Sequence, residues 1–237
     1  PATMGRGPSS AYLRESPVSD HGSNDTSAAR LDWRPGRLEA FSDGVFAIAI
    51  TLLVLDVAVQ PGWEISPLGA LLKLWPQYLA YIVSFATIGA VWIGHAGITH
   101  YLHHVDWIVV RINLLLLLAV SILPFPTRLL AEFLSHESGR RVAAVVLGVN
   151  LLLAVFLLSL LWRAALRRGL VHPDVDDEEV SLVTRRLTPG LAGYIVFILV
   201  GLFLPMVAVV GYLLVTLALL LPGRHRSAAR PSTTDRN

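Results

Sequence analysis

Cysteine is absent from this chain of 237 residues. The protein therefore cannot hold a disulfide scaffold, a cysteine-ligated zinc or iron–sulfur site, or a thiol nucleophile. The sequence also lacks the His-Glu-x-x-His pattern of zinc proteases, the Gly-x-Ser-x-Gly elbow of esterases and a phosphate-binding loop. From these absences we expect no enzyme activity and no bound cofactor.

Charge is scarce as well. Charged residues make up 15% of the chain, against roughly a quarter in a typical soluble domain, whereas hydrophobic residues reach 54%. The 19 arginine and lysine residues nearly balance the 17 acidic ones, so the sequence does not indicate a nucleic-acid-binding protein. This composition predicts a protein embedded in a lipid bilayer.

Apolar segments of membrane-spanning length recur along the chain. A crossing helix needs about 20 largely apolar residues, and the uncharged run Leu187–Gly223 is too long for one crossing and long enough for two. Pro205, near Gly201, is the natural break in that run. The fold class is therefore predicted to be all-α, with six transmembrane helices per chain. The predicted spans are Phe41–Val59, Leu74–Gly94, Ile112–Thr127, Val142–Trp162, Thr188–Leu204 and Met206–Leu221.

The distribution of basic residues predicts the orientation, because arginine and lysine gather on the cytoplasmic side of membranes. With six spans and both termini inside, 14 of the 19 basic residues fall in cytoplasmic segments and four in outer ones. The two ends of the chain carry no apolar periodicity and are rich in small and polar residues. We thus expect a disordered cytoplasmic tail over residues 1–36, a transmembrane domain over 37–223 and a second disordered tail over 224–237.

The first span carries an aliphatic stripe along one face. At 100° per residue the members of this stripe lie within about 40° of Phe41, with Thr51 on the edge. They are Phe41, Ile48, Leu52, Leu55 and Val59. Asp43 falls about 140° away, with Ser42 beside it. The helix therefore opposes an apolar stripe to a polar corner near its cytoplasmic end.

The polar corner needs partners, because a carboxylate inside a membrane helix is costly unless it is paired and usually faces the protein interior. Candidates at the same depth are Trp92 and His95, where the second span ends, and Arg111 and Asn113, where the third begins. Two interpretations remain open. One is a hydrogen-bonded network that pins three helices together, and the other is a proton relay through Asp43 and His95.

The motif Arg37-x-x-x-Phe41-Ser42-Asp43, followed by the aliphatic run Ala47–Leu55, resembles the transmembrane protein 175 family. That family contains prokaryotic and lysosomal potassium leak channels. The resemblance extends to the six-span layout and implies a single-repeat member from a prokaryotic plasma membrane. It also implies a homotetramer in which the first helices line a central pore. Like the prokaryotic members, this chain lacks the Thr-Val-Gly-Tyr-Gly filter of other potassium channels.

The resemblance further implies which positions line the pore. The narrowest constriction would fall on Ile48, a hydroxyl layer on Thr51 and the next aliphatic layer on Leu55, with Leu52 on the same stripe. Potassium holds its hydration water more weakly than sodium, so it would cross such an apolar constriction at lower cost. Hydrophobic constrictions can also gate by dewetting. The expected ligand is then a permeant potassium ion, with no resident metal.

A structural polar network is expected to support this helix. Its predicted members are Arg37, Ser42, Asp43, Trp92, His95, Arg111 and Asn113. A rival function is a proton-coupled secondary transporter, or a proton pathway, that uses Asp43 and His95. A second rival is a membrane enzyme with a histidine-bound metal in the His95–Asp106 loop. The spacing His100-x-x-His103-His104 in that loop could hold a transition metal or sense pH. The expected partners are further copies of the chain, the lipid bilayer and potassium ions.

Overall fold

The computed structural model describes residues 34–57, 67–134 and 136–221. Within these ranges the regular structure is helical, apart from one isolated bridge between Leu102 and Val171. The helices are α1 (Pro35–Leu52), the 3-10 helix η1 (Leu53–Asp56), α2 (Pro67–Lys73), α3 (Trp75–His100), α4 (Trp107–Ile122), α5 (Pro124–Phe133), α6 (Glu137–Arg167), α7 (Asp177–Gly201) and α8 (Pro205–Leu220). The tails predicted over residues 1–36 and 224–237 lie outside the described residues, except that α1 already begins at Pro35.

Five stretches of helix in the described residues are long and apolar enough to cross a membrane. They are α1 with η1, α3, α4 with α5, α6, and α7, while α8 is a shorter apolar helix. The predicted break at Pro205 is also present, because α7 ends at Gly201 and α8 begins at Pro205. The prediction of an all-α membrane protein with six apolar helical segments is therefore confirmed.

Most helices extend several residues beyond their predicted spans, as α6 does at Glu137–Arg167. Two helix boundaries differ most from the prediction. The α-helical part of the first span ends at Leu52 and gives way to η1, whereas a continuous helix to Val59 was expected. Helix α7 begins at Asp177, well before the predicted Thr188. Its first turn holds Asp177, Glu178 and Glu179, and carboxylates are stabilising near a helix N-terminus because of the helix dipole. A search for apolar runs does not detect such a polar helical extension.

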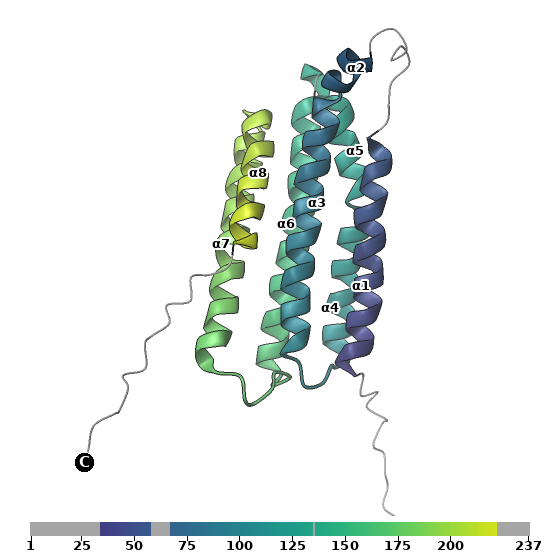
Figure 1. The fold of residues 1–237 in the computed structure, drawn as a ribbon. Coiled ribbons are helices and arrows are strands. Elements are labelled where there is room, and N and C mark those ends of the chain that lie inside the picture. The colour runs from purple at the N-terminus through teal and green to yellow at the C-terminus, as the bar shows by residue number, and fades with distance from the viewer. Residues whose placement is uncertain (1–33, 58–66, 135, 222–237) are drawn as a thin grey trace, which may run out of the picture. The chain divides into compact units, whose positions relative to one another are not determined.

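The helices pack in an order that leaves α1 at one side of the bundle. Helix α1 contacts α3 and α4, whereas α6 contacts α4, α5 and α7. Helices α7 and α8 form a hairpin that also contacts α3 and α6. Figure 1 shows α1 on one side and this hairpin on the opposite side of α3 and α6. Among the residues that the structure describes, one face of α1 is therefore free of contacts.

Glycine allows two of these helix pairs to approach closely. A Cβ atom added at Gly211 of α8 would overlap the ring of Phe197 on α7. One added at Gly148 of α6 would overlap the phenol of Tyr212 on α8. Small residues at helix contacts are the usual means of close packing in membranes, where lipid supplies little hydrophobic drive for association.

Buried hydroxyl groups link α3 to three other helices. Thr87 of α3 lies 2.8 Å from the hydroxyl of Thr216 on α8, which lies 2.7 Å from the hydroxyl of Tyr194 on α7. Ser84 of α3 lies 2.6 Å from Thr127 on α5. All of these groups are buried, so each hydrogen bond satisfies a polar atom that lipid could not.

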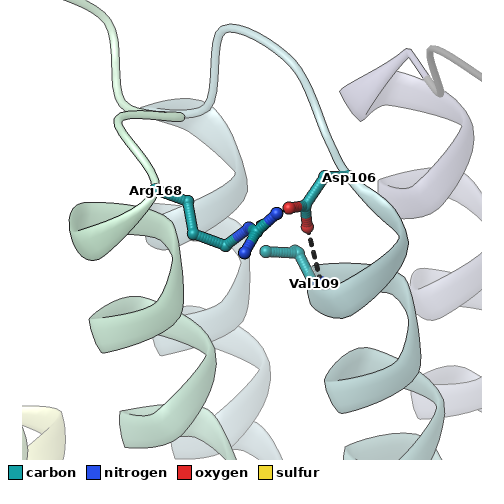
Figure 2. A network of polar contacts seen from close by, with 3 residues as sticks. All are labelled: Asp106, Val109 and Arg168. Carbon is teal, nitrogen blue, oxygen red and sulfur yellow. Dashed lines mark hydrogen bonds and ion pairs between the residues drawn. The ribbon is translucent and has the colours of Figure 1, made fainter. Parts of the chain in front are cut away.

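Two loops are joined at one end of the bundle. The backbone N–H of His103 donates to Leu170 at 2.9 Å, and that of His172 donates to Tyr101 at 2.9 Å. Figure 2 shows a second link beside this one, in which Arg168 at the end of α6 pairs with Asp106. The same carboxylate accepts from the backbone of Val109 at 2.9 Å and so caps the start of α4. The α3–α4 and α6–α7 loops therefore lie together on one side.

Candidate functional site

The aliphatic stripe of α1 faces away from the chain's own bundle. Ile48 is 61% exposed and Leu55 is 71% exposed within the chain. Phe41, Thr51 and Leu52 are exposed on the same face. The structure thus places all of the predicted pore positions, Ile48, Thr51, Leu52 and Leu55, on a surface that is available to another molecule.

The opposite face of α1 is packed. Leu38, Phe46, Ala49 and Leu53 are buried, at intervals of three to eight residues that bring them onto one side of the helix. The hydroxyl of Ser42 is buried among them and donates to the backbone oxygen of Leu38 at 2.8 Å. The side of α1 that carries Ser42 is therefore fixed against α3 and α4, and this contact sets the direction of the exposed stripe.

Thr51 has spare hydrogen-bonding capacity on the exposed face. Its hydroxyl donates to the backbone oxygen of Ile48 at 2.9 Å, within the same helix. A hydroxyl oxygen has two acceptor lone pairs besides its single donor hydrogen, so Thr51 can still face a cation with its oxygen. The stripe thus presents one layer of oxygen between the aliphatic layers of Ile48 and Leu55.

The change to η1 affects the upper part of the stripe. In a 3-10 helix, side chains three residues apart lie nearly one above the other. Leu55 therefore stays in line with Leu52, even though the helix is no longer α-helical from Leu53. Both side chains remain exposed.

A chain of hydrogen bonds joins α1 to α4 and α3. The side-chain N–H of Asn113 on α4 donates to the hydroxyl oxygen of Ser42 at 2.9 Å. The side-chain oxygen of Asn113 lies 2.8 Å from Nε2 of His95 on α3. Because Asn113 offers an oxygen there, Nε2 of His95 must carry the proton. The His95 ring also packs on Phe46, with ring centroids 5.5 Å apart, and all three polar side chains are buried.

Asp43 belongs to a separate branch of the polar network. Its carboxylate accepts from the indole N–H of Trp92 on α3 at 2.9 Å. Among the described residues no hydrogen bond connects Asp43 to His95 or to Asn113. The two residues of the predicted proton relay thus lie on two different branches, and each branch pins α1 to a neighbouring helix.

Two predicted members of the network lie apart from both branches. The guanidinium of Arg111 sits over the indole of Trp107, 4.9 Å from the ring centroid. Arg37 is exposed at the start of α1, and within the described residues it makes no side-chain hydrogen bond or ion pair with Asp43. The spacing of Trp107 and Arg111, four residues apart on one helix, is the signal that would have predicted their contact.

His103 and His104 of the α3–α4 loop contact each other, and His103 also contacts His172 of the α6–α7 loop. The Nδ1 atoms of His103 and His104 lie 2.8 Å apart, and the His103 ring stacks edge-on to His172, with centroids 5.1 Å apart. In the part of the chain that the structure describes, no group of three or more His, Asp or Glu side chains is placed to hold a metal ion.

Comparison with known proteins assigns the chain to a family. Residues 37–124 match the family model described as the endosomal/lysosomal potassium channel TMEM175. These residues run from the Arg37 motif through α3 and α4. They therefore contain the exposed stripe and both branches of the polar network.

Two bacterial relatives and one crystal structure are similar over most of their length. A potassium channel of Chamaesiphon minutus is 44% identical over 66% of this chain and 79% of its own length. A potassium channel of Streptomyces collinus is 42% identical over 67% of this chain and 78% of its own length. The crystal structure of a lysosomal potassium-selective channel TMEM175 homolog from Chamaesiphon minutus matches with a TM-score of 0.69 and 37% identity. It covers 78% of this chain and 96% of that one. This chain therefore belongs to the TMEM175 family.

Proposed function

We propose that this protein is a potassium-selective leak channel whose pore is lined by α1. The observation that carries the proposal is the exposed aliphatic stripe of α1, with Ile48 61% and Leu55 71% exposed. The bacterial relatives named as potassium channels support the choice of ion. No carbonyl filter is needed in this proposal, because side chains of the stripe form the narrowest part of the pore.

A pore built from one helix per chain requires several chains, and we propose a homotetramer. Four Ile48 side chains would then meet around the axis, with the Thr51 hydroxyls in the next layer. An ion that passes the Ile48 ring sheds part of its hydration shell. The cost of this step is lower for potassium than for sodium, because potassium is the more weakly hydrated ion. Thr51 oxygens replace part of the lost water, and the apolar ring also gates by dewetting.

We further propose that the channel lies in a prokaryotic plasma membrane with both termini in the cytoplasm. The excess of arginine and lysine in the segments assigned to that side supports this orientation. The joined α3–α4 and α6–α7 loops are consistent with it, because the six-span topology puts both loops on the cytoplasmic side.

The test is ion flux from liposomes that contain the purified protein. Potassium flux is compared with sodium flux for the wild type, for Ile48→Asn and for Ile195→Asn. Ile195 is an exposed isoleucine of α7, so its substitution is a matched control on the far side of the bundle. We expect potassium to exceed sodium in the wild type and in Ile195→Asn. In Ile48→Asn, total flux should rise and the preference should fall, because a polar ring holds water in the constriction.

Two outcomes would contradict the proposal. An unchanged preference for potassium in Ile48→Asn would show that the first helix does not form the selectivity filter. Flux that saturates and follows an imposed pH gradient would instead indicate a proton-coupled transporter that uses Asp43 and His95.

A further inference from the structure

A groove lies between α3 and the half of α7 that carries its N-terminus, away from the α1 stripe. Its volume is about 250 Å³. Residues from four helices line it, among them Gly94, Gly97, Leu158, Val183, Leu187 and Leu219. We propose that this groove holds one acyl chain of an anionic phospholipid. The proposal rests on a bilayer location and on the proposed assembly through the α1 face, but not on which ion the protein conducts.

The groove exists because α8 is short. Its 16 residues span about 24 Å at 1.5 Å per residue, less than the roughly 30 Å of a bilayer's hydrocarbon core. Figure 1 shows α8 ending partway along α7, while the N-terminal half of α7 continues beside α3 and α6 without it. Leu219 from the last turn of α8 lines the groove, so the groove begins where α8 ends.

The lining selects a hydrocarbon occupant. The groove is apolar apart from Thr87 and Tyr101, and the Thr87 hydroxyl is already bonded to Val83 and Thr216. A water molecule needs two to four polar partners to occupy such a space. An engineered apolar cavity of about 150 Å³ binds benzene, so a groove of about 250 Å³ accommodates a longer hydrocarbon. Hydrocarbon is the surrounding solvent at this depth.

The length of the groove matches one leaflet. Along α3 its lining runs from Thr87 to Tyr101, about 21 Å of helix at 1.5 Å per residue. Half of a bilayer is about 15 Å of hydrocarbon core, or roughly 20–22 Å with its headgroup region. The exposed residues Ile93 and Gly97 stand at the open side of the groove, so a chain can enter laterally from the bilayer.

Other occupants fit less well. Residues 222–237, which follow α8 in sequence, contain four arginines and several polar residues, so they do not match an apolar lining. A second copy of the chain is expected at the α1 face, which lies on the opposite side of α3 and α6 (Figure 1). The groove is therefore at the periphery, where lipid is the neighbour.

An exposed arginine beside the polar end of the groove indicates an anionic headgroup. Trp162 donates to Thr184 at 2.9 Å and packs on Tyr101, so these three residues close that end. Arg163 follows Trp162 and is exposed. Guanidinium groups bind phosphate in bidentate geometry, and each basic residue near an anionic leaflet contributes about 1 kcal/mol to lipid attraction.

Native mass spectrometry of the purified oligomer, titrated with phosphatidylglycerol, tests the proposal. The variants are Gly97→Phe, which fills the groove, and Gly89→Phe, a matched control on the same helix. A Cβ at either glycine meets no heavy atom within 4 Å, and only Gly97 lines the groove. We expect the wild type and Gly89→Phe to retain one lipid per chain and Gly97→Phe to lose it. Equal retention in all three proteins, with the oligomer intact by size-exclusion chromatography, would overturn the proposal.

A photoactivatable phosphatidylglycerol with a diazirine on its acyl chain tests the position. Cross-links should map to Ile93 and Leu187, and Gly97→Phe should reduce them about tenfold, since excluding only two methylene groups costs about 1.6 kcal/mol. The variant Arg163→Gln should retain the cross-links but lose the preference over phosphatidylcholine, whereas Arg185→Gln, on the opposite face of α7, should keep it. No preference in the wild type would overturn the anionic assignment. Protein–protein cross-links that place residues 222–237 or a second copy in the groove would overturn the lipid assignment.

Discussion

At the scale of single residues, Asn113 is the group on which the position of α1 depends most. Its amide donates to Ser42 on one side and accepts from His95 on the other, at 2.9 and 2.8 Å. Both partners are completely buried, and lipid offers no replacement for either bond. A single side chain on α4 thus holds two other helices in register.

We predict that Asn113→Leu destabilises the protein by about 1–2 kcal/mol, because it leaves the Nε2 hydrogen of His95 without an acceptor. Thermal unfolding in detergent measures the loss. Asn150→Leu on α6 is the control, because the side-chain oxygen of Asn150 has no hydrogen-bond partner among the described residues. If both substitutions lower the melting temperature equally, the network does not have the stabilising role that its geometry indicates.

Asp43→Asn separates a structural role from proton transfer. Asparagine keeps an oxygen that can accept from the Trp92 indole, as Asp43 does at 2.9 Å, but it cannot take up a proton. Because a charge-assisted hydrogen bond is roughly twice as strong as a neutral one, we expect about 1 kcal/mol lower stability. Potassium flux per assembled channel should stay close to that of the wild type. Abolished flux in a correctly assembled variant would show that the carboxylate itself takes part in transport.

At the scale of elements, α1 is a helix with two different apolar faces. One face packs on α3 and α4 around Ser42, and the other, which includes Ile48, is open. The hydrogen bonds from Trp92 of α3 to Asp43 and from Asn113 of α4 to Ser42 determine which face of α1 is buried. A rotation of α1 about its axis would bury Ile48 and bring Ser42 to the surface, so the network specifies the lining of the proposed pore.

Two substitutions of Asp106 separate its ion pair with Arg168 from its role as the N-terminal cap of α4. Asp106→Asn should leave stability nearly unchanged, because asparagine caps a helix as well as aspartate does and an exposed ion pair contributes about 0–1 kcal/mol. Asp106→Ala should cost about 1 kcal/mol more, because it also removes the cap on Val109 (Figure 2). Chemical or thermal unfolding measures both. A large loss in Asp106→Asn would show that the pair with Arg168 has a greater role.

Part of this arrangement could be predicted from the sequence. The apolar stripe follows from helical periodicity alone, and the polar corner of Asp43 pointed to partners at the same depth. The contact of Thr87 with Thr216 could not be predicted, because it depends on how two helices distant in sequence align along their axes. The stacking of Arg111 on Trp107 differs from the prediction because the guanidinium meets an aromatic ring one helical turn away instead of the carboxylate of Asp43. The early start of α7 was missed because its first turns are acidic.

At the scale of the whole molecule, the proposed pore needs more than one chain, because the face of α1 that would line it is open. In the proposed homotetramer, each chain contributes one stripe to a shared axis. The absence of cysteine makes the natural chain a ready background for introduced cysteines, because no native thiol competes.

We predict that Leu55→Cys, treated with a short bismaleimide in membranes, gives covalent dimers on denaturing gels. Ile195→Cys, on the exposed face of α7, should remain monomeric under the same conditions. Intact membranes are then cross-linked with a reagent that does not need lysine, because Lys73 is the only lysine in this sequence. The largest cross-linked species on the gel should contain four chains. Dimers from Ile195→Cys alone would place the subunit contact on the opposite side of the bundle.

The open stripe of α1 also constrains how the channel is made. A newly inserted chain presents Ile48 and Leu55 to acyl chains, which cover them at no cost. Once the subunits have assembled around the proposed pore, the same side chains face water and passing ions. Subunit association must therefore expel lipid from the axis, and it does so while exchanging a favourable environment for a less favourable one. The free energy for that exchange has to come from contacts elsewhere on the subunits, so variants far from the axis are expected to control how many channels form without altering what they conduct.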